Sequence, residues 1–250
     1  MANTFFQCKQ FIVHQEHTAM KVCTDACLFG AWLSNERDVL HAKSILDIGT
    51  GTGLLSLMLA QVTKDNTHIT AVEIEPSAAA EAKKNSELSP WANRIFIVQN
   101  SIQAFSKLIH EQAKMDKFDC IVTNPPFFEV DLQSPSNEKN LASHSVALPW
   151  EELLKEVTNL LLDKGTYYVL IPALRAYTMQ KLAAQNGLSL AAEVVVMNAP
   201  QQKPFRVMQK FVKTNAPIQE INRSQFYIKK EDQSYSKAFI QLLAPYYLHL

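Results

Sequence analysis

The sequence predicts an α/β fold with a doubly wound, mostly parallel sheet of seven strands and an antiparallel hairpin at one edge. Three observations predict this fold. Short apolar runs alternate with helical patterns, a glycine-rich turn follows the first run, and two late runs lie too close together for a helix between them. The 250 residues fit a single domain, in which residues 1–43 form an N-terminal extension and residues 44–250 form the core.

Five short apolar runs predict the parallel strands, and each is followed by a helical pattern. The runs are Ser44–Ile48, Ile69–Ile74, Arg94–Val98, Phe118–Thr123 and Thr166–Ile171. The helical patterns are Gly53–Val62, Pro76–Leu88, Ile102–Ala113, Pro149–Leu162 and Leu174–Asn186. The fourth helix is the clearest, because Pro149 suits a first helical turn and Glu151 and Glu152 favour the positive end of the helix dipole.

The C-terminal part of the chain departs from this alternation. Leu190–Asn198 and Phe205–Lys213 are two β runs with only residues 199–204 between them, so we expect an antiparallel pair that closes the sheet. Residues 235–250 predict a helix followed by an aromatic segment. In the N-terminal extension we expect a short β segment and a helix whose cap is Thr24 or Asp25, two residues that could instead line a lid over a ligand.

Composition and charge exclude several classes of protein. No apolar run reaches the roughly 18 residues of a membrane span, and the first residues show no export signal, so we expect a cytoplasmic protein. The four cysteines lack zinc-finger spacing, which favours reduced thiols and no metal site. A net charge of zero argues against a protein that binds nucleic acid over its whole surface. We expect a monomer.

A glycine-rich turn, Asp47-Ile-Gly-Thr-Gly-Thr-Gly53, joins the first expected strand to a helix. Gly49 and Gly51 let a ligand approach the backbone closely, and Gly53 lets the helix pack on the sheet. The third glycine comes one residue too early for the dinucleotide-binding pattern, and Asp47 precedes the turn. An acid at this place suits a ligand with an ammonium group and no pyrophosphate, as S-adenosylmethionine is. The alternative is a tight turn without a ligand.

Two further strand ends carry polar residues that suit the same cofactor. Glu73 closes the second strand, where a carboxylate can accept hydrogen bonds from both ribose hydroxyls. Many enzymes that use S-adenosylmethionine place an acid after the third strand to bind the adenine amino group. Here Asn100 and Ser101 occupy that place and are the candidates for the adenine contact.

The tetrad Asn124-Pro125-Pro126-Phe127 follows the fourth strand and indicates which atom is attacked. An amino group on a base or amide is a poor nucleophile, because its lone pair is delocalised. The side-chain oxygen of Asn124 and the carbonyl of Pro125 can accept its hydrogens, while the two prolines stiffen the loop. Phe127 offers a face for a flipped base. Together with the glycine turn, the tetrad predicts methyl transfer from S-adenosylmethionine to such a nitrogen; the alternative is a proline loop that only ends a strand.

Residues 203–213 form a basic segment with interleaved aromatic residues and no acid, which could follow a phosphate backbone. Its basic residues are Lys203, Arg206, Lys210 and Lys213. The alternative is a solvated strand face. His144, between the tetrad and the next helix, is a further candidate for substrate contact, although it could also be a surface histidine.

Several segments together resemble the bacterial tRNA(Val) adenine-N(6) methyltransferases, which belong to the small-domain methyltransferases. They are Phe5–Trp32, Ile45–Gly53, Ser89–Trp91, Asn124–Phe127, Lys203–Arg206 and Tyr246–Leu248. The resemblance covers nearly the whole chain and implies methylation of the adenosine 3′ of the anticodon, with S-adenosylmethionine as donor. Phe127 stands where that family usually has tyrosine, and the segment Leu141–His144 lacks an arginine expected there.

Three alternatives remain open on the sequence alone. A methyltransferase that modifies a glutamine amide in a release factor needs the same tetrad. One that modifies a guanine amino group in ribosomal RNA usually carries a second domain, for which this chain is too short. An inactive module that binds RNA or cofactor has no use for two acceptors directed at one amine.

Overall fold

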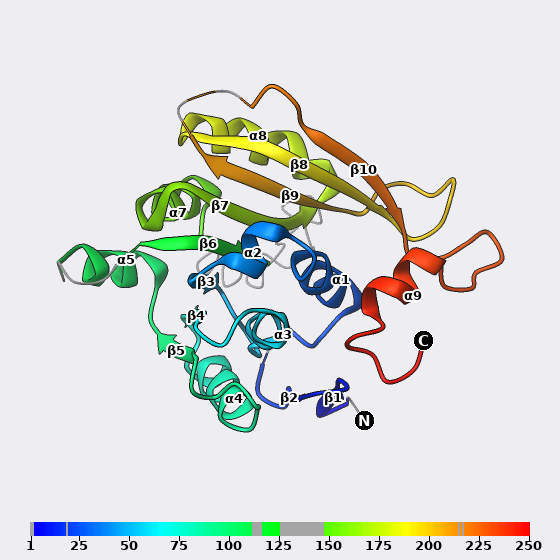
Figure 1. Cartoon of the computed structure of the whole chain (residues 1–250), viewed down its shortest axis with the longest axis horizontal. Coiled ribbons are helices and arrows are strands. Elements are labelled where there is room, and N and C mark those ends of the chain that lie inside the picture. The colour runs from blue at the N-terminus through cyan, green and yellow to red at the C-terminus, as the bar shows by residue number, and fades with distance from the viewer. Residues whose placement is uncertain (1–2, 19, 112–116, 126–147, 215, 217) are drawn as a thin grey trace, which may run out of the picture.

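The computed structural model describes residues 3–18, 20–111, 117–125, 148–214, 216 and 218–250 (Figure 1). In this part of the chain, eight strands form one central sheet. In spatial order they are β10 (Asn222–Tyr227), β8 (Leu188–Met197), β9 (Arg206–Lys213), β7 (Leu161–Pro172), β6 (Phe118–Thr123), β3 (Ser44–Ile48), β4 (His68–Glu73) and β5 (Ile95–Gln99). β9 is antiparallel to both of its neighbours, and every other pair of neighbours is parallel.

Helices cover both faces of this sheet (Figure 1). The helices that share a hydrophobic core on one face are α1 (Thr24–Leu33), α3 (Leu54–Val62) and α9 (Lys237–Leu243). Those on the other face are α5 (Ile102–Glu111), α7 (Trp150–Leu160) and α8 (Ala176–Gln185). The remaining elements are α2 (Arg37–His41), α4 (Pro76–Glu87), the 3-10 turn η1 (Ala173–Arg175) and a two-stranded sheet of β1 (Phe5–Gln7) and β2 (Ile12–His14).

The central strands are apolar because helices bury both of their faces. Along β3, Ile45 joins the core on the side of α1 and α3, whereas Leu46 and Ile48 join the core on the side of α5 and α7. This alternation follows from the two-residue period of a strand. The continuous apolar runs in the sequence are therefore strands that face two cores.

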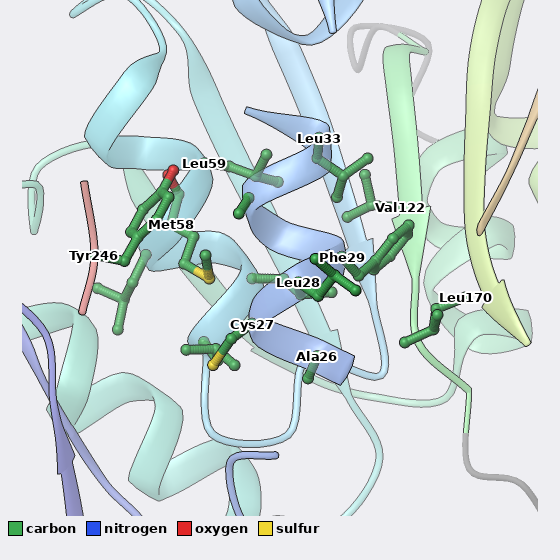
Figure 2. Close-up of a cluster of buried hydrophobic side chains, with 14 of the residues drawn as sticks. Ala26, Cys27, Leu28, Phe29, Leu33, Met58, Leu59, Val122, Leu170 and Tyr246 are labelled. Atoms are coloured by element: carbon green, nitrogen blue, oxygen red, sulfur yellow. The ribbon is translucent and has the colours of Figure 1, made fainter. Parts of the chain in front are cut away.

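Helix α1, from the N-terminal extension, lies at the centre of one core (Figure 2). Seven of its ten residues are buried, so it has apolar residues on all sides. Phe29 points from α1 toward Val122 of β6 and Leu170 of β7, and Met58 of α3 lies on the opposite side of the helix. The helix begins at Thr24, and its cap is Cys23, whose side chain makes no capping hydrogen bond; the expected cap at Thr24 or Asp25 was therefore wrong.

The predicted fold class is confirmed, and the expected seven strands become eight. The additional strand is β10, which pairs in parallel with β8. The hairpin of β8 and β9 therefore has a further strand outside it and does not form the outermost edge. Four of the six residues of β10 are exposed, so the sequence lacks the apolar run that marks the other strands.

Candidate active site

The sheet reverses its strand order between β3 and β6. From β3 the chain proceeds to β4 and β5 on one side, and β6 and β7 lie on the other side. In open α/β sheets, ligands bind in the crevice at the carboxyl ends of the strands at such a point. The polar residues predicted from the sequence follow four of these strand ends: Asp47 with the glycine turn at β3, Glu73 at β4, Asn100 at β5 and Asn124 at β6.

The glycine turn needs its glycines for two different reasons. All three have left-handed backbone conformations, with φ of +72° at Gly49, +57° at Gly51 and +82° at Gly53, which residues with a side chain rarely adopt. A Cβ atom added at Gly49 or Gly51 meets nothing within 4 Å, so the backbone there borders open space that a ligand can enter. At Gly53 it would lie 3.5 Å from Cβ of Ala82 in α4. The close neighbour of Gly53 is thus a helix, and the expected contact with the sheet is corrected.

Asp47 is fully buried beneath this turn. Its Oδ2 accepts hydrogen bonds from Thr50 Oγ1 at 2.6 Å and from Ser56 Oγ at 2.7 Å. Burial raises the pKa of Asp47 to about 6, and the two hydroxyl donors oppose that rise. Its Oδ1 is buried and has no hydrogen-bond partner in the described structure. An unpaired buried carboxylate oxygen fits a ligand that brings an ammonium donor.

Glu73 ties the glycine turn to the end of β4. Its Oε2 accepts from the Gly51 N–H at 2.9 Å, and its Oε1 accepts from the Glu75 N–H at 3.0 Å. A carboxylate offers about four acceptor positions, so each oxygen keeps one for a further donor. The arrangement fits two ribose hydroxyls, which is the contact predicted for Glu73.

Asn100 and Ser101 are already engaged in local hydrogen bonds. Ser101 Oγ accepts from the Ala104 N–H at 3.1 Å at the start of α5, and Asn100 Oδ1 accepts from the Ser101 N–H at 2.9 Å. The side-chain nitrogen of Asn100 has no partner among the described residues and can donate to a ring nitrogen of adenine. The side-chain oxygen accepts one bond, from the Ser101 N–H, and keeps a second lone pair for the adenine amino group.

Asn124 presents an acceptor without a donor. Its Oδ1 is buried and unpaired, and leaving such an atom unsatisfied costs about 1–3 kcal/mol. The strand before it is anchored, because Thr123 Oγ1 donates to the Ile48 carbonyl of β3 at 2.9 Å. The predicted acceptor therefore stands at a fixed place beside the glycine turn. Pro125 follows it and is half-buried, whereas Pro126, Phe127 and His144 lie outside the described residues.

The basic segment 203–213 does not form an open strip. Lys210 pairs with Glu36 at 3.0 Å and with Asp38, and 17 % of its side chain is exposed. Lys213 donates to the carbonyls of Thr158 and Leu161, each at 2.9 Å. The ammonium groups of Lys210 and Lys213 thus already have acceptors within the protein, and a phosphate would have to replace these contacts.

The first half of the segment differs from the second. Arg206 pairs with Asp25 of α1 at 2.8 Å and lies over the ring of Phe205. Lys203 is exposed in the connection between β8 and β9. Of the four predicted basic residues, Lys203 is thus the one that the structure leaves most open to a partner.

Two residues that the sequence did not single out hold the N-terminal segment beside the glycine turn. The carboxylate of Glu81, in α4, accepts backbone N–H groups from Glu16 at 2.5 Å and from His17 and Thr18 at 3.1 Å each. One turn later, Asn85 Oδ1 accepts from the His14 N–H at 2.8 Å, and Asn85 Nδ2 donates to the carbonyls of His14 at 2.8 Å and Thr52 at 2.9 Å. The signal in the sequence was a carboxylate and an amide four residues apart on one expected helix, and the structure shows that both are buried.

Residues 28–178 match the family model described as the methyltransferase small domain, which is more than half of the chain. The chain belongs to the small-domain methyltransferase family. Curated relatives of this methyltransferase extend over its full length. A protein of Dyadobacter fermentans is 39 % identical over 98 % of both chains, and one of Bacteroides thetaiotaomicron is 38 % identical over 100 % of both. Both are named tRNA1(Val) (adenine(37)-N6)-methyltransferase.

Solved structures confirm the class of fold. A predicted O-methyltransferase of Agrobacterium tumefaciens aligns with a TM-score of 0.67 at 14 % identity, over 88 % of this methyltransferase and 96 % of that chain. An O-methyltransferase of Bacillus cereus, solved in complex with SAH, aligns with a TM-score of 0.54 at 15 % identity, over 79 % and 84 %. The family and the fold class confirm the predicted cofactor, S-adenosylmethionine.

No helix in the described part of the chain has the length and hydrophobicity that crossing a membrane requires. The described residues also contain no group of three or more histidine, cysteine, aspartate or glutamate side chains placed to hold a metal ion.

Proposed function

We propose that this methyltransferase transfers the methyl group of S-adenosylmethionine to N6 of the adenosine 3′ of the anticodon in valine tRNA. The unpaired acceptor Asn124 Oδ1, next to the glycine turn, carries the proposal for the chemistry. The relatives support the choice of substrate, since they are named for adenine 37 of tRNA1(Val). Its place of action is then the cytoplasm.

The residues around the glycine turn would hold the cofactor. Asp47 Oδ1 suits its ammonium group, Glu73 its ribose hydroxyls and the Asn100 side-chain nitrogen its adenine ring. Gly49 and Gly51 leave the space that the cofactor needs along the backbone. When bound, S-adenosylmethionine supplies an electrophilic methyl group on a sulfonium centre.

Asn124 and Pro125 would act on the amino group of the adenosine. The nitrogen is planar while its lone pair is shared with the ring, so hydrogen bonds from its two hydrogens to Asn124 Oδ1 and the Pro125 carbonyl fix it with the lone pair directed outward. The nitrogen would then attack the methyl group that S-adenosylmethionine supplies, the electron pair of the carbon–sulfur bond would stay on sulfur, and the methylated amine would release its extra proton to solvent. Since that proton is lost after methylation, alignment contributes more than a strong base does.

Three residues named from the sequence keep their proposed roles although they lie outside the described residues. Phe127 would stack on the flipped adenine, and Pro126 would stiffen the loop that carries the acceptors. His144 would contact the RNA.

The experiment that tests the function is methyl transfer from labelled S-adenosylmethionine to an unmodified valine tRNA transcript, with nucleoside mass analysis of the product. A matched control transcript carries guanosine in place of adenosine 37. We expect N6-methyladenosine in the first transcript and no label in the second. Label in both would move the target to another nucleotide. Label in a release-factor glutamine and in neither transcript would replace the RNA substrate by a protein.

A further inference from the structure

The most exposed large hydrophobic residues in the described structure lie together at one rim of the sheet. Leu174 is 92 % exposed and Tyr177 is 77 % exposed. Leu174 belongs to η1, the turn directly after β7, and Tyr177 belongs to the first turn of α8. Single exposed apolar residues are common, so their position and their charged surroundings decide whether this pair has a role.

Their position is the carboxyl edge of the sheet, beside the candidate active site. Thr123, the residue before Asn124, pairs with Val169 of β7, and β7 ends three residues later at Pro172. The turn η1 therefore begins next to the strand end that carries Asn124. The Ala173 N–H donates to the Phe205 carbonyl at 3.2 Å, which joins η1 to the connection between β8 and β9.

The surroundings are basic although the whole chain has no net charge. Residues 164–219 contain seven lysines and arginines and one acid, Glu193. Arg206, Lys210 and Lys213 are held by contacts within the protein. The exposed cations near the pair are Arg175, Lys181 and Lys203. Lys181 lies four residues after Tyr177 on α8, and this spacing places both on one face of the helix.

We propose that this surface, the docking rim, binds the unpaired anticodon loop of the tRNA, an inference that rests on the proposed function. The docking rim consists of Leu174, Arg175, Tyr177, Lys181 and Lys203. Tyr177 stacks on an unpaired base next to the target, and the three cations contact phosphates. Arg175 is held for this role, since its guanidinium lies 5.3 Å from the ring centre of Trp150. A loop docked here leaves its adenosine beside Asn124.

RNA fits this rim better than a protein partner does. An exposed aromatic residue together with three exposed cations is complementary to bases and phosphates. The rim also lies on the side of the sheet where a flipped adenosine must enter, whereas β5, at the far end of the sheet, presents the exposed Phe96.

The test compares tRNA binding by two rim variants and two controls. Tyr177→Ala removes the stacking ring, and Arg175→Gln with Lys203→Gln removes two charges. The matched controls are Phe96→Ala on β5 and Lys64→Gln in the exposed loop before β4. For each protein we would measure the dissociation constant for valine tRNA over a series of salt concentrations, the dissociation constant for S-adenosylmethionine, and turnover at saturating tRNA.

We expect Tyr177→Ala to weaken tRNA binding about tenfold, and Tyr177→Phe to keep wild-type affinity because it keeps the ring. The double variant should lower the slope of log affinity against log salt by about two, one for each phosphate that the protein no longer neutralises. The rim variants should keep the wild-type affinity for S-adenosylmethionine. Both control variants should keep the wild-type tRNA affinity and salt slope. The targets are exposed, so folding is preserved; equal melting temperatures would verify it.

If the wild type methylates tRNA and the rim variants keep their tRNA affinity and salt slope, the docking rim does not bind the RNA. The proposed function would still hold. A wild-type protein that methylates no tRNA would instead overturn the function. If that protein methylates a release-factor glutamine and Tyr177→Ala raises the KM for that protein, the rim binds a protein and not RNA.

Discussion

Asp47→Asn is the substitution that most clearly separates stability from cofactor binding in this methyltransferase. Burial raises the pKa of Asp47 from its ordinary value of 3.8 to about 6. At about 1.4 kcal/mol per pH unit, keeping this carboxylate ionised costs the folded protein about 3 kcal/mol. Asparagine has almost the same shape, can still accept from Thr50 and Ser56, and carries no charge. The variant should therefore be more stable than the wild type at neutral pH.

The pH dependence follows from the direction of the shift. The folded protein holds the Asp47 proton more tightly than the unfolded chain does, so this contribution to stability is complete below about pH 4 and is lost as the pH rises through about 6. The free energy of unfolding of Asp47→Asn minus that of the wild type should rise over this interval by up to about 3 kcal/mol. Urea unfolding of both proteins without cofactor, at about pH 4.5, 6 and 8, measures this difference. The contributions of the other carboxylates cancel, because both proteins contain them.

Cofactor binding should change in the opposite direction. If the ionised Asp47 accepts the ammonium group, affinity for S-adenosylmethionine rises through about pH 6 in the wild type, and this rise is absent in Asp47→Asn. Titration calorimetry at the same pH values measures it. A variant that is less stable than the wild type at pH 8, or that keeps the pH-dependent rise in affinity, would refute the assignment of a strained, ligand-directed carboxylate.

Three further substitutions test the remaining contacts. Gly53→Ala should lower the free energy of unfolding by about 1–2 kcal/mol, since φ is +82° there; an unchanged urea midpoint would contradict this. Lys210→Met should lower the free energy of unfolding by about 1–2 kcal/mol, because it leaves Glu36 and Asp38 without their cation. The affinity for tRNA should stay unchanged. Weaker tRNA binding by a variant of wild-type stability would instead show that Lys210 contacts the RNA. Glu81→Gln should weaken S-adenosylmethionine binding about tenfold without changing tRNA affinity, as calorimetry and filter binding would show; equal loss of both would make Glu81 a general structural residue.

Local patterns predicted the parts of the fold and the site that depend on neighbours in sequence. The glycine-rich sequence from Asp47 to Gly53 determines the conformation of its own turn, and Asn124 directly follows an apolar strand. Both could therefore be placed at the carboxyl edge of a parallel sheet. β10 was missed because an outer strand needs no apolar face. Its pairing with β8 depends on the tertiary structure and leaves no periodic pattern.

The basic segment shows where sequence patterns fail for charges. Lys210 lies in a run without acids, yet its partners Glu36 and Asp38 come from a helical turn more than 170 residues earlier. Only the fold brings these charges together. The same holds for Glu81, whose three backbone donors belong to the N-terminal segment. Spacing along the chain identifies ligand-binding turns better than it identifies which charges remain free.

The measurement that tests the central claim most directly is single-turnover methylation of valine tRNA by Asn124→Ala, with the dissociation constant for S-adenosylmethionine determined on the same protein. Asn66→Ala, in the exposed loop before β4, serves as the matched control. If the unpaired Asn124 Oδ1 aligns the amino group, the rate of methyl transfer falls by about 100-fold or more while cofactor affinity changes less than about twofold. A wild-type rate, or an equal loss of rate and cofactor affinity, would show that Asn124 does not act on the reacting nitrogen.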